Sequence, residues 1–173
     1  MRWIGPASRV SSNRIHMLPD NLKEHATAAS LEAFDASTVV TAKFDRGELT
    51  IEIVPEKIVS VCGFLKYDLG FVRLSTITGV DWYPAEPRFE VVYHLHSLDR
   101  NERLRLKCRL PGVDPQIDSV TEVWRGANWF ERETFDLFGV RFRNHPDLRR
   151  IMLPDDWQGN PLRKDYNVMG DRG

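Results

Sequence analysis

The residue types that could carry out chemistry are few and scattered in this chain of 173 residues, which has two cysteines and five histidines. Cys62 and Cys108 each lie in an apolar pattern, and two thiols alone cannot hold an iron–sulfur cluster or a four-cysteine zinc site. We interpret both as buried thiols in a reducing compartment. The sequence has no glycine-rich phosphate loop of the GxGxxG or GxxxxGK[ST] type. It therefore predicts no metal or nucleotide chemistry by this chain alone.

The histidines do not form an obvious site either. His94 and His96 share one face of a predicted strand beside a strongly basic strand, which is a poor place for a cation. We interpret the two as solvated or interface histidines, and a metal site is the less favoured alternative. His145 precedes Pro146, which holds its backbone extended, and no Ser or Cys nucleophile is paired with it in sequence. A role in a turn is therefore preferred for His145.

Glu131 is a carboxylate at a position where a charge is costly. At about 100° per residue it falls near the centre of an apolar helical arc that includes Val123, Trp124 and Phe138. A carboxylate there must pair, protonate or lie at an interface. We expect a structural ion pair with an arginine of the C-terminal segment, and a functional role stays open. Glu133 lies about 200° away, so the two carboxylates do not form a catalytic dyad.

Other sides of the same predicted helix also carry informative residues. Arg132 and Asp136 are four residues apart and are expected to pair on the helix surface, a contact worth about 0.2–0.5 kcal/mol. Trp129 points away from the apolar arc. An outward tryptophan indicates a contact surface.

Periodicity predicts the elements that must position these side chains. Helices are expected over residues 20–34, capped by Asp20, over 55–70, and over about 118–138, where Gly139 closes the last one. Strands are expected over residues 39–44, 48–53, 71–80, 89–97 and 102–110. This pattern indicates an α+β fold: a two-layer sandwich with a mainly antiparallel sheet, helices on one face, and an extended C-terminal tail. The expected organisation is an irregular segment over residues 1–17, a globular domain over 18–140 and an extended partner-binding tail over 141–173.

The total charge gives no support to a nucleic-acid partner, because 24 basic residues balance 25 acidic ones. One predicted strand is nevertheless basic on one face, with Arg103, Arg105, Lys107 and Arg109. This face is interpreted as solvated, because the stacking aromatics of RNA-binding sheets are missing from it. A stand-alone α+β nucleic-acid binder remains the rival from another class. No apolar run approaches the roughly 20 residues of a membrane span.

The tail alternates apolar residues with basic ones and has no helical or strand period, which indicates a segment that docks on a partner. The run from Glu131 to Tyr166 closely resembles the motif of the thirty-kilodalton, or C, subunit family of respiratory complex I, the proton-pumping NADH:quinone oxidoreductase. The motif residues, which are also the candidate partner-interface residues, are Glu131, Arg132, Glu133, Asp136, Gly139, His145, Pro146, Arg150, Ile151, Asp156, Trp157, Gly159, Pro161, Leu162, Arg163, Lys164, Asp165 and Tyr166.

The resemblance implies a structural subunit of the peripheral arm, on the cytoplasmic side of the bacterial inner membrane, that meets the membrane only through the complex. It implies no catalytic, metal or cofactor site on this chain; FMN, iron–sulfur clusters, NADH and quinone would belong to other subunits. The implied partners are the forty-nine-kilodalton (D) subunit, near the quinone-reducing module, and neighbouring cluster-carrying subunits. Trp157, Leu162 and Tyr166 would anchor in a partner groove, and Arg163 and Lys164 would pair with partner carboxylates or carbonyls. The alternative is the equivalent subunit of a related membrane-bound hydrogenase or ferredoxin-accepting complex.

Overall fold

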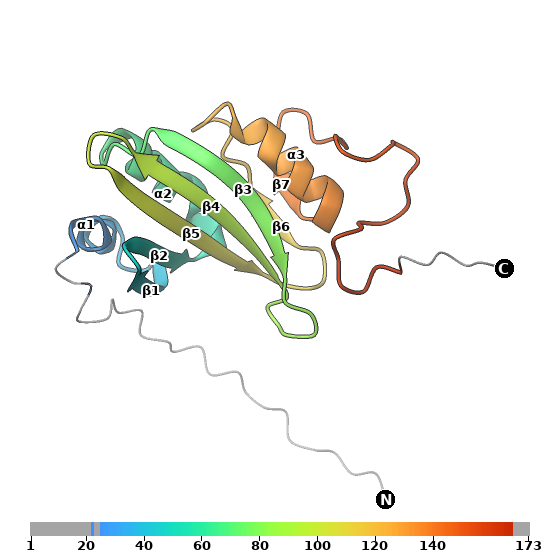
Figure 1. Ribbon diagram of the computed structural model, residues 1–173, viewed down its shortest axis with the longest axis horizontal. Coiled ribbons are helices and arrows are strands. Elements are labelled where there is room, and N and C mark those ends of the chain that lie inside the picture. The colour runs from blue at the N-terminus through green and yellow to red at the C-terminus, as the bar shows by residue number, and fades with distance from the viewer. Residues whose placement is uncertain (1–21, 23–24, 168–173) are drawn as a thin grey trace, which may run out of the picture.

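The structure is a computed structural model that describes residue 22 and residues 25–167 (Figure 1). The expectation for residues 1–17 and the cap expected at Asp20 lie outside this range. Of the helix expected over residues 20–34, the described part forms α1 (Ala26–Phe34), which ends at Phe34 as predicted and has His25 at its N-cap. A five-stranded mixed sheet forms the centre of the domain, with strand order β1-β2-β5-β4-β3. Its strands are β1 (Val39–Asp45), β2 (Glu48–Ile53), β3 (Arg73–Asp81), β4 (Phe89–Ser97) and β5 (Glu102–Leu110).

The sheet is antiparallel except at one position. Strands β2 and β5 run parallel, and every other neighbouring pair is antiparallel. Within β4 and β5 the side chains alternate, so that Tyr93, Leu104 and Leu106 face the core while charged residues face outward. The predicted bounds of these two strands are confirmed to the residue, because strict alternation over nine residues leaves one register that buries every leucine.

Helices cover the apolar face of the sheet, which confirms the predicted α+β architecture. They are α1 (Ala26–Phe34), α2 (Ile58–Tyr67), which follows a short 3-10 turn η2 (Pro55–Lys57), and α3 (Ala127–Phe138). As the sequence predicts, α2 buries Ile58, Val61, Cys62 and Leu65 on one face. Burying each such side chain is worth about 1.5–3 kcal/mol, so this face fixes the helix on the sheet.

Helix α3 lies along the edge strand β3 (Figure 1). The contact is close because Gly79 has no side chain: a Cβ there would stand 2.8 Å from the Phe138 ring. Gly139 ends the helix with φ of +75°, a left-handed conformation that glycine adopts without strain, as predicted. Within the described residues, no helix is long and apolar enough to cross a membrane.

The predicted helix over residues 118–138 is too long, and its part before Ala127 is wrong. Residues 116–118 form a short strand, β6 (Gln116–Asp118), which pairs in parallel with β7 (Arg141–Arg143). The chain then turns, and Val120, Val123 and Trp124 are buried without being helical. The Trp124 indole N–H donates to the Val72 carbonyl at 3.1 Å. Apolar residues spaced three and four apart can therefore be buried by a turn as well as by a helix.

The tail prediction needs two corrections. Residues 141–143 form strand β7 rather than the start of an extended tail. Beyond β7 the described residues form no further helix or strand, yet they do not stand clear of the domain. In Figure 1 this segment, coloured orange to red, passes along α3 and returns toward the connection between β3 and β4. The contacts that hold it there define the candidate site.

Candidate functional site

The first anchor of the tail is Asp136, whose side chain is fully buried on α3. Its Oδ2 accepts three backbone N–H groups of the tail, from Ile151 at 3.0 Å, Met152 at 2.8 Å and Leu153 at 2.9 Å. Its Oδ1 accepts from the Arg150 guanidinium at 2.5 Å. Burial opposes ionisation of this carboxyl, but the four donors outweigh burial and hold the pKa of Asp136 below its ordinary value. Asp136 therefore fixes the backbone of the tail as a charged acceptor.

Arg150 extends this anchor further along the tail. Its Nη2 donates to the carbonyls of Trp157 at 3.0 Å and Gly159 at 3.1 Å, so one guanidinium closes a loop between residues 150 and 159. Arg132 on α3 donates to the carbonyls of Arg149 and Arg150, each at 3.2 Å. The predicted surface pair between Arg132 and Asp136 is therefore wrong. Both side chains are bound to the tail instead, because its unpaired backbone groups need partners at this depth.

The second anchor is Arg88, which precedes β4 and lies between two carboxylates. It donates to Asp81 at 2.8 and 2.7 Å and to Asp165 of the tail at 2.8 and 2.6 Å. The Lys164 backbone N–H also donates to Asp81, at 2.9 Å. These contacts, led by the Arg88 hydrogen bonds, hold the pKa of Asp81 and of Asp165 below the ordinary range. The end of the described tail is thus fixed to the β3–β4 connection.

Two further contacts hold the tail between these anchors. The Arg163 Nε donates to the Phe138 carbonyl at 2.9 Å, and the same guanidinium lies 4.8 Å from the centre of the Phe89 ring. A Cβ at Gly159, whose φ is +79°, would stand 2.8 Å from the Tyr166 ring, so that ring packs on its own chain. Arg163 and Tyr166, both expected to meet a partner, therefore have internal contacts. Partner contacts for them, and for the Lys164 side chain, stay predictions.

Glu131 is buried as predicted, but its partners differ from the expected arginine. Its carboxylate accepts from the Ser119 hydroxyl at 2.6 Å and from the Val120 N–H at 2.8 Å. The only cation-capable group paired with it in the described part of the chain is the His145 imidazole, with Nε2 at 3.9 Å from Oε2. Burial raises the pKa of Glu131 to about 7, against the lowering effect of its two hydrogen bonds. The predicted arginine pair is therefore wrong.

His145 is neutral in this arrangement. The Asp147 backbone N–H donates to its Nδ1 at 3.0 Å, which places the ring proton on Nε2, facing the Asn128 carbonyl at 3.4 Å and Glu131. Burial lowers the pKa of His145. The histidine ties the start of the tail to α3, and the turn role predicted for it agrees with the hydrogen bond to Asp147. The pair joins the tail to the domain through a neutral imidazole and a carboxyl group whose pKa is about 7.

Several large apolar side chains remain exposed on and beside the anchored tail. The exposed fractions are 61% for Met152, 42% for Trp157, 51% for Leu162 and 60% for Trp129. The outward position predicted for Trp129 is confirmed. We call these four residues the apolar patch. Among the other motif residues, Glu133, Pro146, Asp156 and Lys164 are exposed, while Ile151 and Pro161 are half-buried.

Sequence reasoning missed Asp81, Arg88 and Ser119 as parts of this site. They lie outside the motif run, and no periodic pattern marks them. Both cysteines are buried, as predicted, and burial raises the pKa of each thiol, so neither supplies a thiolate. Within the described residues, no group of three or more His, Cys, Asp or Glu side chains could hold a metal ion.

The fold and the anchored tail define a class: an α+β domain whose C-terminal segment is fixed along its own last helix and exposes several large apolar side chains. Residues 51–172 match the model of the family described as respiratory-chain NADH dehydrogenase, 30 Kd subunit. Among the curated relatives named as the C subunit of NADH-quinone oxidoreductase is that of Geobacter sulfurreducens, 51% identical over 140 residues, which are 80% of this chain and 86% of the relative. That of Geotalea uraniireducens is 44% identical, over 88% of this chain and 93% of the relative.

Two solved structures are also similar. One is titled Nqo5 of the trypsin-resistant fragment (1-134), with a TM-score of 0.61 and 32% identity over 70% of this chain and 97% of that chain. The other is from the membrane-bound sulfane sulfur reductase, an archaeal respiratory membrane complex, with a TM-score of 0.74 and 25% identity over 85% of this chain and 87% of that chain. The chain belongs to the respiratory-chain NADH dehydrogenase 30 kDa subunit family, and it is a complex I subunit.

Proposed function

We propose that this chain is a structural subunit of the peripheral arm of proton-translocating NADH:quinone oxidoreductase and docks on the forty-nine-kilodalton (D) subunit near the quinone-reducing module. The tail and the apolar patch would make this contact. The complex would lie with this arm on the cytoplasmic side of the inner membrane. FMN, clusters, NADH and quinone would be bound by other subunits, so the chain would act by holding its neighbours in place.

The observation that carries this proposal is the exposure of Met152, Trp157 and Leu162 on a backbone that the domain holds in place. Large apolar side chains in polar surroundings mark a protein contact site. Tryptophan is enriched among the residues that dominate binding energy. Because Asp136 and Arg150 fix the backbone beforehand, less conformational entropy is lost when a partner binds. A rigid apolar patch of this kind fits a permanent subunit interface.

The thiols support the expectation that electron carriers are held elsewhere. Cys62 and Cys108 are fully buried in the core, and the raised pKa of each keeps it protonated. A thiolate ligand for a cluster would require deprotonation inside an apolar core, which burial opposes. Both residues instead fill the space between α2 and the sheet.

A second candidate function is the equivalent position in a related respiratory membrane complex. The similarity to a chain of the sulfane sulfur reductase complex favours it, with a TM-score of 0.74 over 85% of this chain. The Nqo5 match covers less of this chain, but that structure is a fragment (1-134) and is itself covered to 97%. Sequence identity favours the NADH-linked assembly, because it is 51% to the C subunit of Geobacter sulfurreducens and 25% to the chain of the sulfane sulfur reductase complex. NADH-dependent quinone reduction by the complex purified with this chain separates the two.

The structure determines how docking should be tested. Deleting the tail from Asn144 would remove all the tail donors to the buried Asp136 and would leave Arg88 with Asp81 alone, so the deletion would damage the domain itself. A triple substitution of Met152, Trp157 and Leu162 to Ser removes the exposed apolar groups and keeps both anchors. The expected result is loss of the D subunit when the tagged chain is purified from membranes, together with loss of NADH-dependent quinone reduction.

The matched control is Val113→Ser, at an apolar residue that is 85% exposed in the connection between β5 and β6. It removes a comparable exposed group away from the tail and should leave co-purification unchanged. Circular dichroism and thermal unfolding of each isolated variant confirm that the domain is folded. Retention of the D subunit by the triple variant at the wild-type level would overturn the docking proposal.

A further inference from the structure

The outer face of the sheet, opposite the helices, pairs most of its cations with carboxylates of the same chain. Glu48 pairs with Arg105 and lies 3.9 Å from the His94 ring. Glu90 pairs with Lys107 at 2.9 Å and with Arg109 at 3.5 Å. Cross-strand pairing of this kind stabilises a sheet. A cation on this face without such a partner is therefore an exception.

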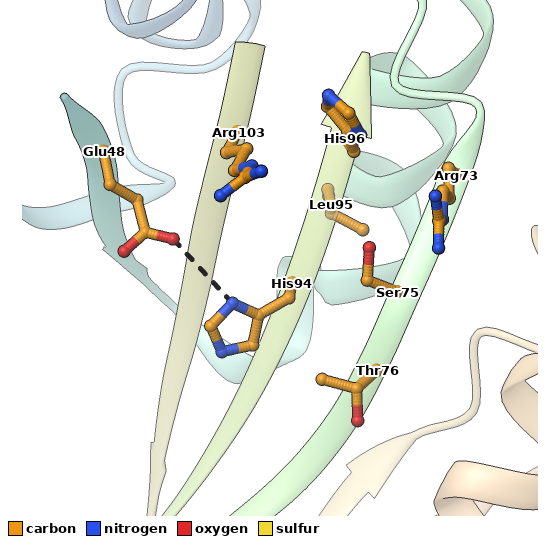
Figure 2. Close-up of a pocket in the computed structure, with 8 residues that line it drawn as sticks. All are labelled: Glu48, Arg73, Ser75, Thr76, His94, Leu95, His96 and Arg103. Carbon is orange, nitrogen blue, oxygen red and sulfur yellow. Dashed lines mark ion pairs between the residues drawn. The ribbon is translucent and has the colours of Figure 1, made fainter. Parts of the chain in front are cut away.

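The exception is one row of three residues across β3, β4 and β5. In the register of the sheet, His96 is directly opposite Arg73 on β3 and opposite Arg103 on β5. Figure 2 shows the three side chains on neighbouring strands around one hollow. Glu48, on the strand beyond Arg103, also lines this hollow, and the dashed line marks its ion pair with His94. Within the described part of the chain, neither arginine makes an ion pair or a side-chain hydrogen bond. The buried Nε2 of His96 also has no hydrogen-bond partner there.

This arrangement costs stability in the isolated chain. Two guanidinium groups on either side of one strand repel each other when no carboxylate lies between them, and a buried polar atom without a partner costs further stability. A carboxylate bound over the row would satisfy both arginines. The hollow has a volume of about 420 Å³ and is also lined by Ser75 and Thr76, which offer further hydroxyl donors. A counter-charge for this row would be negative and would come from outside the described residues.

The surroundings of the row indicate what carries this charge. Arg73 also lines a second hollow, together with Val72, Leu98 and Arg125. Val72 is 52% exposed and Leu98 is 57% exposed, and Arg125 is exposed without an ion pair among the described residues. Exposed aliphatic side chains beside unpaired guanidinium groups fit a segment that carries both carboxylates and apolar residues. A small anion would use the row and leave Val72 and Leu98 exposed.

We propose that the row of Arg73, His96 and Arg103, with Val72 and Leu98 beside it, binds an acidic, apolar-flanked segment of another subunit of the same complex. This second interface lies on the outer face of the sheet, apart from the tail. It requires membership in a multi-subunit complex, and it does not depend on docking of the tail to the D subunit. If the triple variant of the tail retains the D subunit, this inference is unaffected. If the cross-link from position 103 fails, the docking proposal for the tail is unaffected.

The test places an amine in the row and asks which carboxylate lies next to it. Arg103→Lys keeps the positive charge and permits a zero-length carbodiimide cross-link to a neighbouring Asp or Glu in the assembled, purified complex. Mass spectrometry then identifies the acid. The expected product joins position 103 to an acid of another subunit. Lys107, 2.9 Å from Glu90, supplies an internal control, because its link to Glu90 shows that the reagent reached this face.

A second substitution tests whether the row itself selects that acid. Arg73→Glu, added to Arg103→Lys, should lower the yield of the inter-subunit link by about tenfold or more, because it places a repelling charge beside the bound carboxylate. The matched control is Lys43→Glu, an exposed charge reversal on β1. It should leave the yield unchanged.

Two results would overturn the proposal. The first is a link from position 103 only to acids of its own chain, or no link, while the Lys107–Glu90 product forms. The second is a small-anion site. It would be shown if inorganic phosphate or anionic lipid vesicles raise the melting temperature of the isolated chain, Arg103→Glu removes that effect, and no inter-subunit link forms.

Discussion

The sheet and the tail of this protein are held in place by different forces. Between the sheet and α2 the contacts are apolar, with Leu104, Leu106 and Cys108 packed against one helix face. The tail is fixed mainly by charged and polar groups, above all Asp136 and Arg88. Apolar burial tolerates small changes in geometry, whereas a buried charge needs every donor in place. The tail should therefore respond sharply to the loss of a single polar partner.

Asp136→Ala should have the largest effect. It leaves three tail N–H groups and Arg150 without their acceptor, and losing one partner of a buried ion pair costs about 3–5 kcal/mol. We expect the tail to detach while the sheet stays folded. Limited trypsin digestion should then cut faster after Arg149 and Arg150 than in the wild type, with no change in far-UV circular dichroism.

The control for this prediction is Asp156→Ala, which removes an exposed carboxylate from the same segment. Its digestion should match the wild type. Equal cleavage rates for Asp136→Ala and the wild type would show that the tail is not held by this carboxylate.

Leu106→Ala tests the other half of the comparison. This fully buried residue lies in the middle of the core, and its truncation should cost about 3 kcal/mol of global stability by urea unfolding. The whole domain should lose stability, and no selective cleavage of the tail should occur. Val113→Ala, at an exposed site, should stay within about 0.5 kcal/mol of the wild type. Selective release of the tail by Leu106→Ala would contradict the claim that apolar contacts hold the sheet and polar contacts hold the tail.

Glu131 links the two regions, and its stability contribution depends on pH. Its pKa is raised to about 7 in the folded chain from 4.5, so folding is favoured when the carboxyl is protonated. The contribution is fully present below pH 4.5, falls as pH rises through about 7, and amounts to about 3 kcal/mol. Glu131→Gln should remove this dependence, as measured by urea unfolding from pH 5 to 9. Its amide oxygen can accept from the Val120 N–H, and its amide nitrogen donates to the Ser119 hydroxyl instead of accepting from it.

The comparison of Glu131→Gln with the wild type isolates this group, because other titrations, including that of His145, are present in both proteins. The variant should gain stability relative to the wild type as pH rises. A difference that stays constant across the range would show that Glu131 does not titrate there.

Gly79→Ala should have the smallest effect and probes the contact between α3 and the sheet. The added methyl would stand 2.8 Å from the Phe138 ring, and such overpacking typically costs about 1–3 kcal/mol. Gly63→Ala on α2 is the matched control, because no atom beyond its chain neighbours and its own helix backbone lies within 4 Å of the added methyl. That substitution should stabilise the helix by about 0.5–1 kcal/mol. Opposite signs of the two shifts in thermal unfolding would confirm that α3 packs tightly on β3.

The sequence predicts the apolar region far better than the polar one. Strands β4 and β5 and the buried face of α2 follow from alternation and from helical spacing. The burial of Glu131 follows from the same spacing, although the expected helix was partly wrong, because Val120 and Trp124 are buried by a turn that presents the same residues to the core. Periodicity reports which side chains are buried, and it is less informative about the backbone that buries them.

The anchors of the tail could not be predicted in this way. Arg88 and Asp165 are 77 positions apart in the chain, and no spacing rule connects them. The resemblance identified Asp136 and Arg150 as motif residues, but it did not show that they bind each other. The contact between His145 and Glu131 likewise depends on how β7 returns the chain to α3. The sequence therefore identified these positions as motif residues, but only the folded structure shows which residues they contact.

Hydrogen exchange of the Ile151, Met152 and Leu153 amides in the isolated, full-length chain tests the central claim most directly. If Asp136 holds the tail on its own domain before any partner binds, these three amides should exchange far more slowly than unstructured peptide. They should lose that protection in Asp136→Ala and keep it in Asp156→Ala. Exchange at the rate of unstructured peptide in the wild-type chain would contradict the account.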